Sequence, residues 1–266
     1  MITLPHTLGQ HFAYSLGRLG VLESQLLKVT DIDRLLGAHS ADEAVKMLRD
    51  IEFISEPDES QGTRNETQEY QQILDASTEL LKKNIEKMAP EEKHFIFDIL
   101  WIEGDRAKIS FDLKAKHNFT SDIAVEPRPP VTAGIEMHFD EVFSSPTDID
   151  NAVAKECENK TIALAKQSGS KAIINYVEMK NELEVARTDL RKSDNPDIDS
   201  IVFEKEVSAS LGQHLTEMQK MILGPEALFS YAARVQNHIA LLKVLLTGKV
   251  NNLPIQEIKS LLPPLL

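Results

Sequence analysis

The side chains best suited to chemistry are few and lie in two short stretches. His138, Asp140 and Glu141 follow a proline-rich segment and are residue types that bind divalent metals. Cys157, the one cysteine, could supply a thiolate nucleophile. The three residues around position 140 lie in a polar loop, and charged residues flank the cysteine in a helical stretch. We therefore interpret the cluster as a solvated turn and Cys157 as a bystander.

Motifs of nucleotide-binding and hydrolytic folds are missing from the sequence. Gly248 and Lys249 lack the earlier glycine and the following Ser or Thr of a Walker A loop. There is no dinucleotide-binding glycine pattern, no His-Glu-x-x-His and no Gly-x-Ser-x-Gly nucleophile elbow. We expect a protein without catalytic residues, bound metal or cofactor. A hydrolase that uses Cys157 or His138 is kept as an alternative.

Composition narrows the possible partners. The chain has 266 residues with 42 acidic and 29 basic side chains, and its net charge of −13 opposes binding to nucleic acid or to an anionic membrane. Its most apolar stretch, 239–246, is interrupted by Lys243 and is too short to span a bilayer. We expect a cytoplasmic protein with no direct lipid anchor and no nucleic-acid partner.

Apolar residues recur every three or four positions along most of the chain, which predicts an all-α fold of about ten helices. The pairing of Ser40 with Glu43 predicts a capping box, and Pro90, Gly169 and Gly248 are expected to follow helix ends. A flexible loop is expected at 55–65 and an extended segment at 119–133. The expected helices cover residues 8–28, 32–36, 44–48, 66–88, 91–117, 145–166, 171–191, 198–223, 226–247 and 255–262.

Three of these helices align with one another without gaps. The segments are 105–116, 182–193 and 238–249, and Leu113 and Leu246 fall on the same position. Amphipathic helices also align by chance, so this alternative stays open. If the repeat is real, the chain contains three helical units that close by packing on one another.

Residues 229–254 resemble the closing segment of one subunit family of V/A-type rotary ATPases, the family named C in those enzymes and d in the eukaryotic vacuolar enzyme. The family pattern is an apolar helix with a basic residue in its middle, followed by Gly-Lys-x-Asn-x-Leu-Pro. The opening segments 14–27, 33–36 and 41–50 are similar to the start of the same family, and 112–116 resembles its recurring basic helix end. The positions of this chain that fit the closing pattern are Lys243, Gly248, Lys249, Asn251, Leu253 and Pro254.

Some positions depart from the family pattern. Gln236 or His238 stands where an acidic residue is usual in the final helix, and Leu241 replaces an asparagine there. The corresponding asparagine of the middle helix falls at Lys108. These departures affect the family contacts that depend on the same positions.

The resemblance implies a funnel-like adaptor of three related helical subdomains, at 1–123, 124–197 and 198–266. Such an adaptor is non-catalytic and couples the central stalk to the membrane proteolipid ring during ATP-linked proton or sodium transport. It is held on the cytoplasmic side by its protein partners. The alternative is a free-standing helical scaffold or regulatory binding module without a rotary role. For the helix-end charges themselves, the alternative to partner contacts is that they are solvated caps. The residues expected to bind partners are Asp105, Lys114, Glu182, Arg191, Gln236, Lys243 and Lys249.

Overall fold

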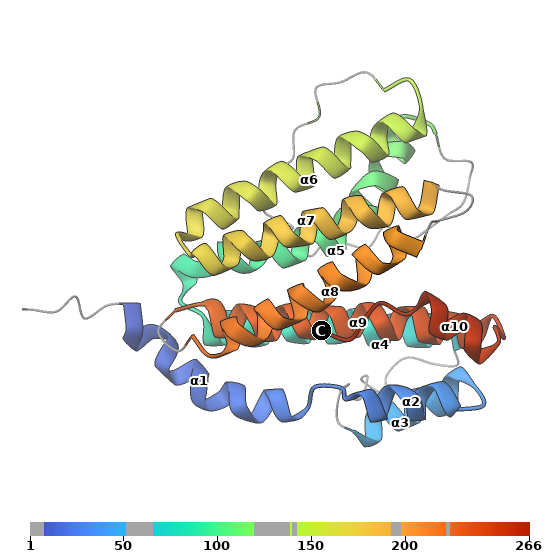
Figure 1. Ribbon diagram of the computed structural model, residues 1–266, viewed down its shortest axis with the longest axis horizontal. Helices are drawn as coiled ribbons and strands as arrows, with labels where there is room; N and C mark the ends of the chain where they lie inside the picture. Colours follow the sequence, from blue (N-terminus) through green and yellow to red (C-terminus); the bar gives the residue numbers. More distant parts are fainter. Residues whose placement is uncertain (1–7, 52–65, 120–138, 140–142, 193–197, 222–223) are drawn as a thin grey trace, which may run out of the picture. The chain divides into compact units, whose positions relative to one another are not determined.

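The computed structural model describes residues 8–51, 66–119, 139, 143–192, 198–221 and 224–266 (Figure 1). Within these ranges it has ten α-helices, one short 3-10 helix and no strand, which confirms the all-α fold. The loop expected at 55–65 and nearly all of the segment expected at 119–133 lie outside the described residues. The elements are α1 (Leu8–Ser24), α2 (Val29–Gly37), α3 (Ala41–Asp50), α4 (Glu66–Met88), η1 (Glu91–Lys93), α5 (Phe95–Lys116), α6 (Pro146–Ser168), α7 (Lys171–Lys192), α8 (Ile198–Gln219), α9 (Glu226–Val250) and α10 (Ile255–Leu261).

Several helix ends follow from local chemistry that the sequence shows. α4 stops at Met88, two residues before Pro90, as expected. Gly169 adopts the left-handed conformation with φ of 70° at the end of α6. Ser40 Oγ accepts a hydrogen bond of 3.1 Å from the Glu43 N–H at the start of α3, which confirms the cap. The other half of the predicted capping box is shifted, because Glu43 Oε2 accepts from the His39 N–H at 2.6 Å.

The expected role of Gly248 is wrong. α9 continues past this glycine to Val250, and the left-handed residue is Asn252, with φ of 54°. The Leu253 N–H donates to the Gly248 carbonyl at 2.9 Å, so the helix closes in a Schellman-type turn built on an asparagine. Gly248 instead allows a close approach, since a Cβ at this position would lie 2.7 Å from Cγ1 of Ile258 in α10.

Two compact units make up the chain. The first combines Met1–Glu91 with Leu183–Leu266, and the second is the continuous segment Glu92–Glu182. These limits differ from those of the three subdomains expected at 1–123, 124–197 and 198–266, and that division stays a prediction.

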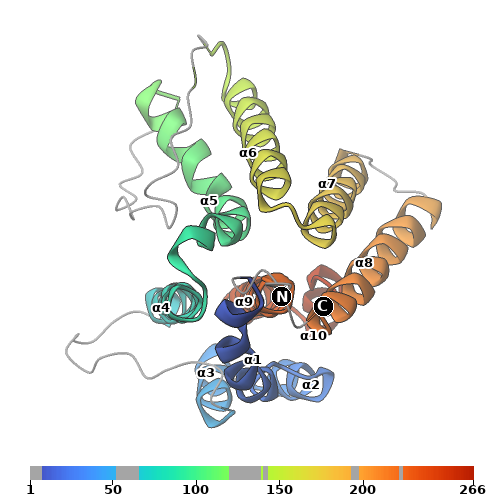
Figure 2. The same ribbon diagram turned by 90° about the vertical axis from the view of Figure 1, so that its left-hand side faces the viewer.

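α9 is the central helix of the first unit. It packs against α1, α3, α4, α8 and α10, and Figure 2 shows these helices around it. Its apolar residues face neighbours on several sides, so the helix is buried over most of its length. The hydrophobic core of this unit therefore joins early and late parts of the chain. Its fully buried members from α2, α3, α4 and α9 include Leu35, Leu48, Ile73, Leu242, Leu245 and Leu246.

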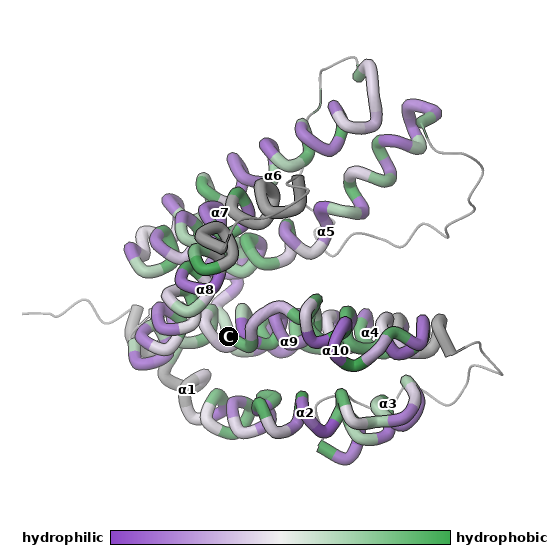
Figure 3. Tube along the Cα trace, turned by 45° about the vertical axis from the view of Figure 1, so that its right-hand side comes forward, coloured by the Kyte–Doolittle hydropathy of each residue, from purple (hydrophilic) through white to green (hydrophobic). Residues whose placement is uncertain are grey.

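The second unit is built on the pairing of α5 with α6. Along both helices hydrophobic and hydrophilic residues alternate every few positions (Figure 3). On α6 the buried residues Ile149, Val153 and Cys157 are four residues apart and form one stripe. No helix among the described residues is long and apolar enough to cross a bilayer.

Candidate functional site

The end of α9 is the part of the predicted site where the structure is most informative. Gly248 is buried there against Ile258. Lys249 follows it in the last turn and extends its side chain toward α2. The sequence motif that contains these two residues therefore forms a junction of α9, α10 and α2.

Lys249 closes the end of α2. Its Nζ donates to the Leu36 carbonyl at 3.0 Å and to the Ala38 carbonyl at 2.5 Å, which are acceptors that the helix itself leaves unpaired. Burial lowers the pKa of the Lys249 ammonium, although the Glu43 carboxylate acts in the opposite direction. Two of its three donors are thus used inside this unit, so the observed contacts of Lys249 are those of a structural clamp.

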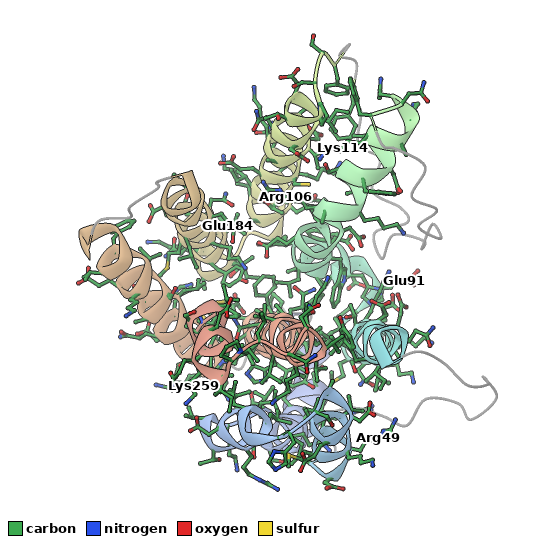
Figure 4. All side chains as sticks on the ribbon, turned by 90° about the vertical axis from the view of Figure 1, so that its right-hand side faces the viewer. Arg49, Glu91, Arg106, Lys114, Glu184 and Lys259 are labelled. Atoms are coloured by element: carbon green, nitrogen blue, oxygen red, sulfur yellow. The ribbon has the colours of Figure 1, made fainter. Side chains whose placement is uncertain are left out.

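α10 makes a second link to α2. Lys259 Nζ lies 3.7 Å from Oδ1 of Asp33, and Figure 4 labels the lysine on its helix. Both side chains are about half exposed, so this ion pair contributes little to stability. It nevertheless places α10 beside α2, in agreement with the clamp formed by Lys249.

α5 ends in the same kind of turn as α9. Asn118 has φ of 59°, and the Phe119 N–H donates to the Lys114 carbonyl at 2.8 Å. In α9 the corresponding bond joins Leu253 to Gly248, five residues apart as well. The two caps therefore match with Lys114 opposite Gly248. The gapless sequence alignment paired Lys114 with Thr247. The structural match of the two helix ends is therefore shifted by one residue from that alignment.

Lys114 ties α5 to α6. Its Nζ lies 2.7 Å from the Asp150 carboxylate, and Ser110 Oγ donates a short hydrogen bond to the same group. Burial by itself would raise the pKa of Asp150. The hydrogen bonds from Lys114 and Ser110, together with the charge of Arg106, outweigh it, and the pKa lies below its ordinary value. Figure 4 labels Lys114 and Arg106 on α5.

The predicted residues are divided between the two units: Asp105, Lys114 and Glu182 lie in the second, and Gln236, Lys243 and Lys249 lie in the first. Asp105 is buried in α5, whereas Glu182 is exposed on α7. Gln236 and Lys243 lie seven residues apart on the same side of α9, the first partly buried and the second exposed. The Arg191 side chain lies outside the described side chains.

The alternative function, a hydrolase that uses Cys157 or His138, gains no support from the described residues. Cys157 is 5% exposed, and burial raises the pKa of its thiol to about 11, so the thiolate is scarce near neutral pH. The predicted cluster of His138, Asp140 and Glu141 lies outside the described residues. In the part of the chain that the structure does describe, no group of three or more His, Cys, Asp or Glu could hold a metal ion.

Sequence reasoning noted His238 only as a departure from a family pattern. In the structure the ring is 1% exposed, and its Nδ1 accepts a hydrogen bond of 3.3 Å from the Leu27 N–H. Burial first, and the charge of Arg234 second, lower the pKa of His238 to about 4. A lone histidine in an apolar helix was the available signal, but its partner lies 211 residues away in the chain.

No protein-family model matches this chain, and no curated protein matches it.

Proposed function

We propose that this protein is a non-catalytic adaptor in the central stalk of a V/A-type rotary ATPase. It would couple the soluble rotor shaft to the membrane proteolipid ring during ATP-linked proton or sodium transport. The observation that carries the proposal is the junction at the end of α9. The closing motif with Gly248 and Lys249 contacts the opening segment that ends at Leu36, and both segments resemble the same family.

The contact between these two segments makes the resemblance more than a pair of local matches. Lys249 donates to the Leu36 carbonyl, and both Leu36 and Leu246 belong to one hydrophobic core. Two stretches that resemble a single family at opposite ends of a chain are expected to fold together if the resemblance reflects common ancestry. Chance similarities in two unrelated helices carry no such expectation.

The matching ends of α5 and α9 also support the proposal. Both helices close on an asparagine with positive φ, at Asn118 and Asn252, and in both a bond spans five residues. The related helical subdomains that the resemblance implies would share such a cap. Torque transfer requires packed helices rather than catalytic groups, and the net charge of −13 favours attachment to a membrane through protein partners.

The partner contacts of this adaptor are expected on exposed charges rather than on the clamping lysine. Glu182 and Lys243 are exposed and have no hydrogen bond or ion pair among those described. Lys249, in contrast, already donates to two carbonyls of α2 and its end. Glu182 and Lys243 are therefore the residues to reverse in a binding test.

The experiment is purification of the tagged chain from mildly solubilised membranes, with the recovered proteins identified by mass. We expect a coiled-coil stalk protein and a small proteolipid. Reversal of both charges, by Glu182→Lys and Lys243→Glu, should reduce their recovery. Lys83→Glu on α4 is the matched control at another exposed lysine. Recovery of the chain alone would refute the rotary proposal and favour the free-standing scaffold. Recovery of both partners by the double variant would refute only the assigned contact residues.

A further inference from the structure

Arg234 is a partly buried arginine of α9, on the side of the helix that packs against α8. Its hydrogen bond within the described residues runs from Nη2 to Thr216 Oγ1, at 2.7 Å. The Nε atom is buried there without a hydrogen-bond partner. No carboxylate of the described residues forms an ion pair with this guanidinium, although the net charge of the chain is −13. Most of the N–H donors of Arg234 are therefore unused.

Several lysines of the structure show how the chain usually pairs a basic group. Lys114 Nζ lies 2.7 Å from a carboxylate oxygen of α6, and Lys180 Nζ lies 3.1 Å from one of α5. Lys249 donates to two main-chain carbonyls. Burial of a charge without such partners costs free energy, and burial lowers the pKa of Arg234 accordingly. A carboxylate from another protein would remove this cost.

α8 holds the guanidinium in one orientation. Thr216 accepts from Nη2, and its own hydroxyl donates to the Gly212 carbonyl at 3.0 Å, one turn earlier in the same helix. Thr216 is exposed, so the Nη end of Arg234 reaches the surface while Nε is covered. The planar donors of an arginine match the two oxygens of a carboxylate. An orientation fixed in advance lowers the entropy that binding costs.

Glu23 of α1 is the acidic group of this unit that acts on Arg234. Its charge raises the pKa of Arg234, against the larger effect of burial, and it also acts on Tyr231, one turn earlier in α9. Glu23 is partly buried and forms no ion pair with the arginine. The surroundings of Arg234 thus favour a negative charge without supplying a contact to one.

We propose that Arg234, held by Thr216, binds an aspartate or glutamate side chain of the coiled-coil stalk protein. The inference rests on the rotary function proposed above and names the chemistry of one of its contacts. A coiled coil often carries Glu at the positions that flank its apolar seam, so its surface offers carboxylates on a rigid helix. A proteolipid is apolar over most of its length and offers few such groups.

The test repeats the membrane purification with Arg234→Gln. This variant should bind the stalk protein roughly tenfold to a hundredfold more weakly, the effect of losing one charged hydrogen-bonded pair. Recovery of the stalk protein should fall, while the proteolipid is still recovered. Retention of the proteolipid shows that the variant is folded. Arg34→Gln, at an exposed arginine of α2, is the matched control and should behave as wild type.

Two further variants separate the charge of the site from its geometry. Glu23→Gln removes the carboxylate of the chain that competes for Arg234, so it should strengthen binding of the stalk protein severalfold. Thr216→Val keeps the charge of Arg234 but frees its orientation. This exposed substitution should weaken binding by less than Arg234→Gln does.

The outcomes distinguish this inference from the function on which it rests. Equal recovery of the stalk protein by Arg234→Gln and wild type would overturn the inference and leave the rotary proposal standing. Loss of the proteolipid alone would overturn it too, because Arg234 would then face the other partner. If Arg234→Gln loses both partners, Thr216→Val applies the same criteria. If wild type recovers neither partner, the rotary proposal fails and this inference fails with it.

Discussion

Because His238 is buried, the free energy of unfolding of the protein should fall as the pH is lowered from about 6.5 toward about 4. The pKa of this histidine falls from 6.5 to about 4 in the fold, mainly because the ring is buried. The folded state thus favours the neutral ring. Its contribution to stability is complete above about pH 6.5 and is lost as the pH falls toward about 4.

The size of the effect follows from linkage between protonation and folding. With pKa values of about 6.5 unfolded and about 4 folded, the free energy of unfolding should drop by about 2 kcal/mol between about pH 7.5 and about pH 5. His238→Gln removes the titration and keeps a polar amide at the site. The drop should then nearly vanish, apart from the titration of other groups.

Urea denaturation followed by circular dichroism provides the measurement. Wild type and His238→Gln are compared at several pH values, with His39→Gln as the control because His39 is exposed. The difference between wild type and His238→Gln should change by about 2 kcal/mol over this interval, while the His39 variant follows wild type. Parallel profiles for all three proteins would show that His238 does not titrate as its burial requires.

Other substitutions test the packing described above. Gly248→Ala should lower the free energy of unfolding by about 1–3 kcal/mol, because the new Cβ would lie 2.7 Å from Cγ1 of Ile258. Gly104→Ala, whose Cβ would meet nothing within 4 Å, should raise the free energy of unfolding by about 0.5–1 kcal/mol. Calorimetry measures both variants, and equal shifts in their melting temperatures would exclude the close approach at Gly248. Lys249→Met should lower the free energy of unfolding by about 1–3 kcal/mol, because it removes the two hydrogen bonds to the end of α2. Lys243→Met, at an exposed lysine of the same helix, should lower it by less than about 0.5 kcal/mol. Similar denaturation midpoints for the two variants would refute the clamp. Cys157 should react with thiol reagents far more slowly in the folded protein than in urea at neutral pH, and equal rates would show that it is not buried.

Much of the fold could be predicted from local sequence signals. The bounds of α4 follow from its apolar stripe and from Pro90, and Gly169 ends α6 because it can adopt a positive φ. Gly248 misled the prediction because its requirement is not local. A neighbouring helix approaches it closely, and Asn252 provides the positive φ instead. The same sequence signal, a glycine near a helix end, thus has two different physical causes.

The candidate site was less predictable because its contacts join distant parts of the chain. Lys249 looked like a free helix-end charge, yet its acceptors include the Leu36 carbonyl, 213 residues away. His238 had no apparent partner in its own helix, and its acceptor role depends on Leu27. Periodicity places such residues on a helix but does not identify the main-chain groups that face them.

The central place of α9 has a consequence for synthesis on the ribosome. Helices α1, α3 and α4 are made before α5 to α8, but α9, the helix against which all three pack, is made only after α8. The segment 92–182 is continuous and can pair α5 with α6 as soon as it leaves the exit tunnel. The order of folding therefore differs from the order of synthesis. The nascent chain must keep exposed apolar faces apart until α9 arrives, which makes this interval the one in which chaperones matter most.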